Sequence, residues 1–428
     1  MNSIKNRRIL DVLNGIPVDK TPVWIMRQAG RYLPEYKKTR ATAGSFLDLC
    51  KTPELASEVT IQPINRFDLD AAIIFSDILT IPDAMGLDLK FEDNRGPYFD
   101  NPLDNINDVS SLSDGNLDSL NYVAEAIVQT KNKLNNEVPL IGFSGSPWTL
   151  STYMVEGAAT KEFRKVRSIV FNNPEMLNKL TKKLINSISE YLIMQAKAGA
   201  DILMIFDSWG GLLNTDNYIH FSLNPMKEII RNLRKNKFTK DMPIILFTKG
   251  GGGWLDQISK SGCNGIGLDW TTNISKARKI TGDNICLQGN LDPCALHGTE
   301  EAIKASGEKV IDDYGFGHRH IFNLGHGIDQ YVNPDNLKIL IDHVKEYSKK
   351  YHKNKNNFSI SISSCFFSFI LFSLLNVFGT NSFLKTSVIE FFESGEANKP
   401  FLLSIFALTN PSGSSKLDIG DFFNATFI

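Results

Sequence analysis

The chain has 428 residues, 42% of them hydrophobic and 22% charged, a composition typical of a globular protein with a large core. Its formal net charge of −1 argues against a partner that needs an overall basic field, such as nucleic acid or an anionic membrane. The five cysteines are scattered without a CxxC pair, which argues against a disulfide framework and a cysteine-rich zinc site.

The N-terminal residues 1–15, MNSIKNRRILDVLNG, contain neither an apolar core nor a small-residue cleavage site. They therefore predict no signal peptide. Together with the unpaired cysteines, they indicate a cytoplasmic protein.

Short apolar runs that end in polar or glycine-rich residues recur along the chain. They show little alternation, as expected of buried parallel strands. Helical patterns separate them, most plainly at 173–200, 224–237 and 333–351. Eight strand–helix units favour a single closed (β/α)8 TIM-type barrel over an open doubly wound sheet. The eight predicted strands are residues 22–26, 71–75, 138–143, 201–206, 243–247, 264–268, 285–288 and 320–324.

A barrel of this kind places its catalytic residues just after the strands, at the carboxyl-terminal rim. The side chains in such positions are Arg27, Arg31, Ser76, Asp77, Ser144, Ser146, Asp207, Ser208, Lys249, Asp269, Asn290, Asp292 and His326. This set of residues contains no Ser-His-Asp order, no P-loop and no HExxH motif.

Two arginines follow the first predicted strand in the segment MRQAGR (26–31). Arg27 and Arg31 are four residues apart, so they share one side of a helical turn or converge from a rim loop. Guanidinium groups bind carboxylates through paired hydrogen bonds and stay charged. Arg40 is a third candidate. The alternative is a solvated basic face, but the apolar run before the pair favours a carboxylate-binding site.

Asp77 follows the second predicted strand, where it is either a carboxylate at the barrel mouth or the N-cap of the next helix. Tyr153 offers a hydroxyl at the edge of a pocket, or is a buried tyrosine. The glycine-rich segment 247–255 lacks the P-loop spacing and predicts a tight strand-to-helix turn. His326 is a candidate acid, base, hydrogen-bond donor or metal ligand. His318 and His320 are expected at the start of the last strand, away from it.

The barrel pattern stops near residue 350, and an uncharged stretch of 22 residues follows at 358–379, long enough to cross a bilayer. We therefore predict a barrel domain over 1–352 and a C-terminal extension over 353–428. The extension is a membrane anchor, a small packed addition, or non-domain sequence without ordered structure. We favour the third, and expect membrane contact only if 358–379 is an anchor.

The motifs PVWIMRQAGRYLPEY, IIFSDIL, GFSGSPWTLSTYMVEG, FDSWGG, FTKGGG, GLDWTT, LQGNLDP and FNLGHG occur in this order over roughly residues 4–350. Together they resemble the uroporphyrinogen decarboxylase family, in particular its bacterial or plastid branch. The resemblance implies a homodimeric TIM barrel without metal or organic cofactor. It also implies conversion of the four acetate side chains of uroporphyrinogen III to methyls, giving coproporphyrinogen III and four CO2 in heme biosynthesis.

The resemblance also implies a role for each matching residue. Asp77 matches the central carboxylate that accepts hydrogen bonds from the pyrrole N–H groups. Arg27 and Arg31 match arginines that bind substrate carboxylates, one of which positions or delivers a proton. The remaining matches are substrate contacts, with Phe206 packing against the macrocycle: Tyr153, Ser208, His326, Arg40 and Phe206.

Two other functions remain open at this stage. One is a methyltransferase of related fold that uses zinc and a corrinoid, although no cysteine accompanies His326 at ligand spacing. The other is a tetrapyrrole carrier without catalytic activity. A metal assay separates the first alternative from the decarboxylase, and a turnover assay separates the second.

Overall fold

The computed structural model describes residues 4–92, 96–114 and 117–352, which lie within one compact unit, Met1–Lys353. Its centre is a seven-stranded parallel sheet in the order β1-β4-β5-β6-β7-β8-β9. The strands are β1 (Ala72–Ile73), β4 (Leu140–Gly145), β5 (Ile202–Asp207), β6 (Ile244–Thr248), β7 (Gly265–Gly267), β8 (Cys286–Gln288) and β9 (His320–Ile321). Each coincides with a predicted apolar run.

Residues 22–26 close the curled sheet between β9 and β1. Val23 forms a parallel bridge with Phe322, and the Asp70 N–H donates to the Val23 carbonyl at 2.8 Å. The prediction of a full strand here is wrong in one respect, because the segment makes a single bridge rather than a ladder. Side chains replace the missing strand partners: the Ile25 N–H donates to Gln28 at 3.2 Å and the Met26 N–H to Asn323 at 2.9 Å.

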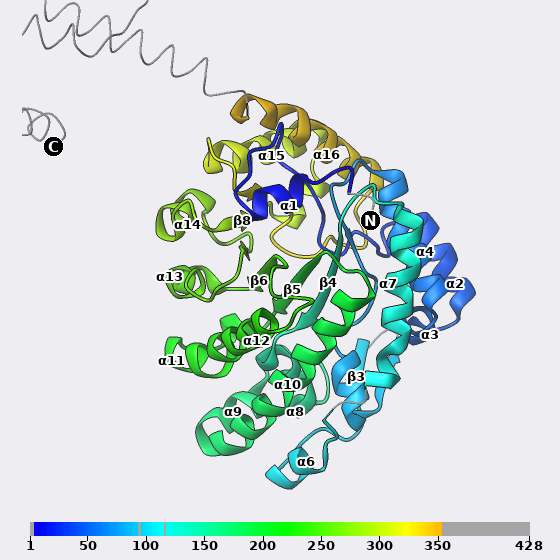
Figure 1. The fold of residues 1–428 in the computed structure, drawn as a ribbon, viewed down its shortest axis with the longest axis vertical. Coiled ribbons are helices and arrows are strands. Elements are labelled where there is room, and N and C mark those ends of the chain that lie inside the picture. Colours follow the sequence, from blue (N-terminus) through cyan, green and yellow to red (C-terminus); the bar gives the residue numbers. More distant parts are fainter. Residues whose placement is uncertain (1–3, 93–95, 115–116, 353–428) are drawn as a thin grey trace, which may run out of the picture. The chain divides into compact units, whose positions relative to one another are not determined.

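Helices surround the strands in a ring (Figure 1). From the N-terminus to β5 they are α1 (Arg8–Leu13), α2 (Pro34–Ala43), α3 (Phe46–Lys51), α4 (Pro53–Arg66), α5 (Thr80–Pro82), η1 (Asp83–Leu87), α6 (Ile106–Ser111), η2 (Leu117–Leu120), α7 (Asn121–Leu134), α8 (Pro147–Glu156), α9 (Arg164–Asn172) and α10 (Pro174–Ala198). After β5 they are η3 (Gly210–Leu212), α11 (Thr215–Tyr218), η4 (Ile219–Leu223), α12 (Asn224–Lys235), η5 (Gly251–Trp254), α13 (Leu255–Ile258), α14 (Ile274–Thr281), η6 (Pro293–His297), α15 (Glu300–Tyr314), α16 (Pro334–Ser348) and η7 (Lys349–Tyr351).

Local sequence explains the ends of the longest helix, α10. The Asn173 side chain accepts a hydrogen bond from the Met176 N–H, Pro174 occupies the first helical position, and Gly199 ends the helix with φ +117°. One face of α10 is apolar and buried, so burial of that face holds the helix in the ring. Helices predicted at 173–200, 224–237 and 333–351 are confirmed as α10, α12 and α16.

The insertion between β1 and α7 contains a hairpin that the sequence patterns did not predict. Its strands, β2 (Leu89–Glu92) and β3 (Gly96–Phe99), pair antiparallel. Two backbone bonds fix this insertion to the end of α8: Phe99 N–H to the Gly157 carbonyl at 2.7 Å and Leu103 N–H to the Met154 carbonyl at 2.8 Å. These anchors connect the hairpin to the helix that carries Tyr153.

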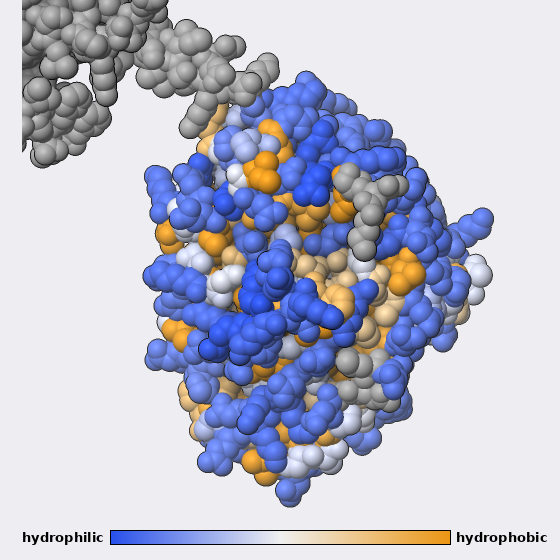
Figure 2. All heavy atoms as spheres, viewed as in Figure 1, coloured by the Kyte–Doolittle hydropathy of each residue, from blue (hydrophilic) through white to orange (hydrophobic). Residues whose placement is uncertain are grey.

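Hydrophilic residues cover most of the face seen in Figure 2, with hydrophobic residues interspersed among them. No helix among the described residues is long and apolar enough to span a membrane. The apolar stretch predicted at 358–379 lies outside the described residues.

Candidate active site at the barrel mouth

The parallel strands all point the same way, so the residues that follow them meet at one rim, here called the barrel mouth. Arg27 follows the closing segment, Asp77 follows β1, and Tyr153 lies on α8, the helix after β4. Ser208 follows β5, and His326 follows β9. The fold thus gathers at one end of the barrel side chains that are up to 299 residues apart (326 − 27).

Arg27 is central to this group. Its positive charge acts to lower the pKa of Asp77, Tyr153 and His326. Among the described residues, no carboxylate forms an ion pair with Arg27. Its backbone has φ +63°, a left-handed conformation that is costly for a residue with a side chain. Gly327 leaves the space for its side chain, because a Cβ there would lie 2.3 Å from Arg27 Cδ.

Gln28 holds this strained turn in place. The buried Gln28 side-chain amide donates to the Ala71 carbonyl at 3.2 Å, and the backbone carbonyl of Gln28 accepts from the Tyr32 hydroxyl at 2.8 Å. These bonds fix the turn against β1, the strand that leads to Asp77. They therefore restrict the position of the Arg27 backbone relative to β1.

Asp77 has one oxygen engaged and one available. Its Oδ1 accepts the Leu79 N–H at 2.7 Å, and the second oxygen has no hydrogen-bond partner among the described residues. Burial raises the pKa of Asp77, while the Leu79 bond and Arg27 oppose that rise. The predicted N-cap role is wrong, because Leu79 is the N-cap of α5 and no side chain caps that helix. Asp77 instead orders the turn before α5 and keeps one oxygen as an acceptor at the barrel mouth.

Tyr153 and His326 border the mouth as partly buried polar rings. Burial raises the pKa of Tyr153, the charge of Asp77 adds to that rise, and the charge of Arg27 opposes it. Burial, Arg27 and Lys249 lower the pKa of His326 to about 4, so its imidazole is neutral near pH 7. His326 is then a neutral hydrogen-bonding group rather than a cation.

Aromatic rings from the ends of the strands form an apolar wall next to these polar groups. Phe206, at the end of β5, packs edge-on against Phe143 at 5.6 Å and Phe247 at 6.0 Å between ring centroids. The His326 ring lies 6.3 Å from Phe247 and 6.1 Å from Trp270. The mouth therefore combines aromatic rings with polar and charged side chains.

The other predicted contact residues occupy the rim at different depths. Arg31 is exposed and without an ion-pair partner among the described residues, and its charge acts on Tyr36. Arg40 lies on α2, donates to the Gly44 carbonyl at 3.0 Å, and acts on Tyr36 and on Cys50. Ser208 is partly buried directly after β5. Arg27, Asp77, Tyr153 and His326 therefore form the inner group, with Arg31 and Arg40 placed toward Tyr36.

The histidines near the start of β9 are separate from the site. His320 begins β9 and is 2% exposed, its Nε2 lies 2.9 Å from the Gly289 carbonyl, and its ring stacks on Tyr314. The prediction that it does not act with His326 agrees with this position. The predicted turn at 247–255 is also confirmed, since Gly250 has φ +77° directly before η5.

Two buried aspartates support the rim. Asp207 accepts hydrogen bonds from the hydroxyls of Ser146 at 2.6 Å, Thr149 at 3.0 Å, and Ser222 at 2.6 Å. These bonds join the ends of β4 and β5 to η4. Asp269 accepts from Thr271, Thr272 and the Gly250 N–H in the same way.

The sequence patterns gave no sign of Cys50, which the fold brings near Asp77. Cys50 is 2% exposed, burial raises the pKa of its thiol well above the usual value, and Asp77 adds to that rise. Only the fold brings α3 next to the segment after β1, through the ring contact of Phe46 with Phe75, so no local signal in the chain could have identified this thiol.

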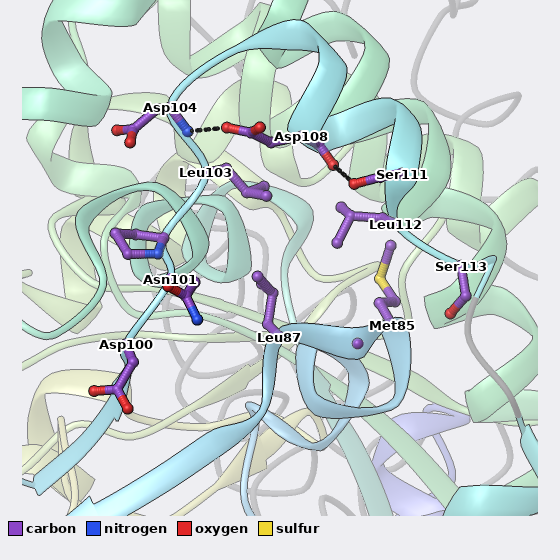
Figure 3. Close-up of a pocket in the computed structure, with 12 residues that line it drawn as sticks. Met85, Leu87, Asp100, Asn101, Leu103, Asp104, Asp108, Ser111, Leu112 and Ser113 are labelled. Atoms are coloured by element: carbon purple, nitrogen blue, oxygen red, sulfur yellow. Dashed lines mark hydrogen bonds between the residues drawn. The ribbon is translucent and has the colours of Figure 1, made fainter.

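A hollow of about 710 Å³ lies apart from this group, between η1, the segment after β3, and α6 (Figure 3). Leu87, Leu103 and Leu112 line it. Two of its acids have partners: Asp108 accepts the Asp104 N–H at 2.8 Å, and Lys165 pairs with Asp104. None of the predicted site residues lines it. Across the described ranges, no three His, Cys, Asp or Glu side chains are grouped as metal ligands.

Comparison with known proteins gives a family match over most of the chain. The family model described as "Uroporphyrinogen decarboxylase (URO-D)" matches residues 4–347. The uroporphyrinogen decarboxylase of Pseudoalteromonas translucida is 52% identical over 355 residues, covering 82% of this chain and 100% of that protein. That of Neisseria meningitidis serogroup C / serotype 2a is 49% identical over 352 residues, covering 82% and 99%. A solved methyltransferase from Methanosarcina mazei has a TM-score of 0.67 at 19% identity, covering 81% of this chain and 99% of that chain, and so shares the fold alone.

Proposed function

Because the chain belongs to the uroporphyrinogen decarboxylase family, we propose that it converts uroporphyrinogen III to coproporphyrinogen III by removing four CO2. The observation that carries the mechanism is Asp77 at the barrel mouth, with one oxygen unbonded among the described residues and with the charge of Arg27 opposing the rise in its pKa. An acceptor of this kind binds several N–H donors at once, which the pyrroles of a tetrapyrrole supply.

The chemistry needs a place for the electrons that the departing CO2 leaves behind. Protonation of a pyrrole carbon gives a cationic ring, and the Asp77 carboxylate stabilises that cation. The bond between the acetate carboxyl and its methylene then breaks, and the electron pair moves into the ring and cancels the charge. A proton added to the former methylene completes the methyl group, and loss of the ring proton restores the pyrrole. The substrate ring is the electron sink, so this route uses no cofactor.

The arginines and neutral ring groups have complementary roles in this proposal. Arg27 and Arg31 bind carboxylates of the substrate, and Arg27, close to Asp77, positions the reacting acetate. Arg40 is assigned to a more distant carboxylate. Tyr153 and Ser208 are hydrogen-bonding partners at the rim.

The two ring-facing groups complete the site. Neutral His326 hydrogen-bonds a substrate side chain, and Phe206 packs on the macrocycle. These two roles are supported by the positions of the rings, because the rings of Phe206 and His326 both pack against Phe247.

We also propose that the protein is a cytoplasmic homodimer and that residues 1–352 are the catalytic domain. The family resemblance supports the dimer, and Tyr331, 80% exposed shortly after His326, is a candidate interface side chain. Buried, unpaired Cys50, Cys263 and Cys286 suit a reducing compartment. Sedimentation analysis tests the dimer, and cell fractionation tests the location.

The function is tested by anaerobic incubation of the full chain with uroporphyrinogen III, followed by oxidation and chromatography of the porphyrins. Coproporphyrin should accumulate above the enzyme-free blank. An unchanged octacarboxylate peak would reject the activity, and tight binding without turnover would favour a carrier instead. Stoichiometric zinc in active preparations would instead favour the methyltransferase chemistry considered from the sequence.

A further inference from the structure

Lys249 brings a further positive charge to the barrel mouth, from the strand opposite the arginine segment. In the order of the sheet, β6 is four strands away from residues 22–26 in either direction around the eight-membered barrel. Lys249 directly follows β6, and its backbone is fixed: its N–H donates to the Asp207 carbonyl at 3.2 Å, and its carbonyl accepts the Gly211 N–H at 3.0 Å. The residue therefore has a defined starting point on the far side of the rim.

Two indole rings hold the ammonium group over the mouth. The Nζ atom lies 5.8 Å from the Trp209 ring and 5.5 Å from the Trp270 ring. Trp209 follows β5 and Trp270 follows β7, so the neighbouring strands on both sides supply a ring face. Such faces attract a cation and limit its motion without neutralising its charge.

The acidic groups nearest in the fold do not neutralise Lys249 either. Asp207 is saturated by the hydroxyls of Ser146, Thr149 and Ser222, and Asp269 by threonine hydroxyls and the Gly250 N–H. Among the described residues no carboxylate forms an ion pair with Lys249. A partly buried cation that has aromatic neighbours but no carboxylate partner remains able to bind a carboxylate of a ligand.

We propose that Lys249 is a further substrate-binding residue, which holds a carboxylate on the side of the macrocycle remote from Arg27 and Arg31. The inference rests on the proposed function, because a tetrapyrrole with acidic side chains around its whole periphery needs cations on both sides of the mouth. It also explains why a lysine suits this position. A single site that removes four acetates must receive the macrocycle in several orientations, and a point charge on a flexible stem accepts each of them.

The test uses Lys249→Met, which keeps the length of the side chain but removes the charge, beside Lys249→Arg, which keeps the charge. KM and kcat are measured with uroporphyrinogen III. Binding of the same substrate is measured in an Asp77→Asn background by anaerobic quenching of tryptophan fluorescence. Lys237→Met is the matched control, because Lys237 also lies over an aromatic ring, 5.0 Å from Phe238, but on the outer surface after α12.

The proposal predicts that Lys249→Met raises KM and Kd by about tenfold or more, as expected for loss of a charged hydrogen bond. It also predicts that kcat falls by less than about threefold, that binding becomes less sensitive to salt, and that Lys249→Arg retains most of the affinity. Lys237→Met should leave all four quantities unchanged.

An unchanged KM and Kd in folded Lys249→Met would overturn the proposal. If that variant does not fold, Lys249→Gln is the second neutral variant, and the same comparison decides. A loss of stability with unaltered affinity would assign Lys249 a structural cation–π role and also overturn it. Failure of wild-type protein to decarboxylate would reject the function itself, and the binding titration would still report on Lys249 separately.

Discussion

The role of Asp77 as the central charge predicts a large effect from Asp77→Asn. Asparagine keeps an oxygen that can accept the Leu79 N–H, bonded at 2.7 Å, so the turn before α5 is preserved and the variant loses mainly the charge. Opposite charges about 4 Å apart interact by about 4 kcal/mol at an effective dielectric constant of about 20. Each 1.36 kcal/mol changes a rate by about tenfold, so kcat should fall by about a thousandfold.

The assay is the anaerobic time course of porphyrins with fewer carboxylates, measured for wild type and variant at equal concentrations. Asp100→Asn is the control, because it removes the same charge from an exposed carboxylate that pairs with Lys90. Urea unfolding of both variants verifies that the fold is intact. If folded Asp77→Asn keeps a kcat within about tenfold of wild type, the stabilisation of a ring cation by Asp77 is refuted.

Four further predictions follow from the same geometry. Arg27→Asn should unfold at a similar or higher urea concentration, because asparagine tolerates the left-handed backbone at φ +63° better, while turnover falls about a hundredfold; a clear loss of stability would contradict this. Gly327→Ala should lower activity at least tenfold in a folded protein, since its Cβ would displace Arg27; normal kinetics would show that Arg27 has room to move. His320 has a pKa lowered by burial from 6.5 to about 4, so the unfolded chain binds its proton first. Its contribution, at most roughly 3 kcal/mol, should be present above about pH 6.5 and lost toward pH 4, and His320→Gln should flatten that slope in urea titrations. Truncation after residue 352 should leave kcat and the unfolding midpoint unchanged, and an inactive truncated protein would show that the extension contributes.

The sequence predicted the barrel well because buried parallel strands leave a strong local signal. Runs such as 201–206 and 243–247 are uniformly apolar, and both are strands in the structure. The closing segment 22–26 was harder, because it makes a single backbone bridge and the side chains of Gln28 and Asn323 accept the N–H groups that follow that bridge. The hydrophobic periodicity of a sequence carries no information about side chains that bind backbone N–H groups. The hairpin β2–β3 was missed because its strands are short and only partly buried.

The position of the candidate residues at the rim was predictable from the sequence, but their contacts were not. Rim positions followed from the strand ends, which is how Asp77 and His326 were identified. The left-handed backbone of Arg27, the space left by Gly327, and the approach of Cys50 to Asp77 depend on segments far apart in the chain. Lys249 was visible as a rim residue, but its lack of an acidic partner became apparent only when the bonds of Asp207 and Asp269 were known.

The most direct test of the account is the amount of CO2 released per coproporphyrinogen III formed by the full chain, with a metal chelator present throughout. The account predicts four CO2 for each product molecule and a rate that the chelator does not change, because the substrate ring is the electron sink. Absence of CO2 release, or release that stops when metal is removed, would contradict it.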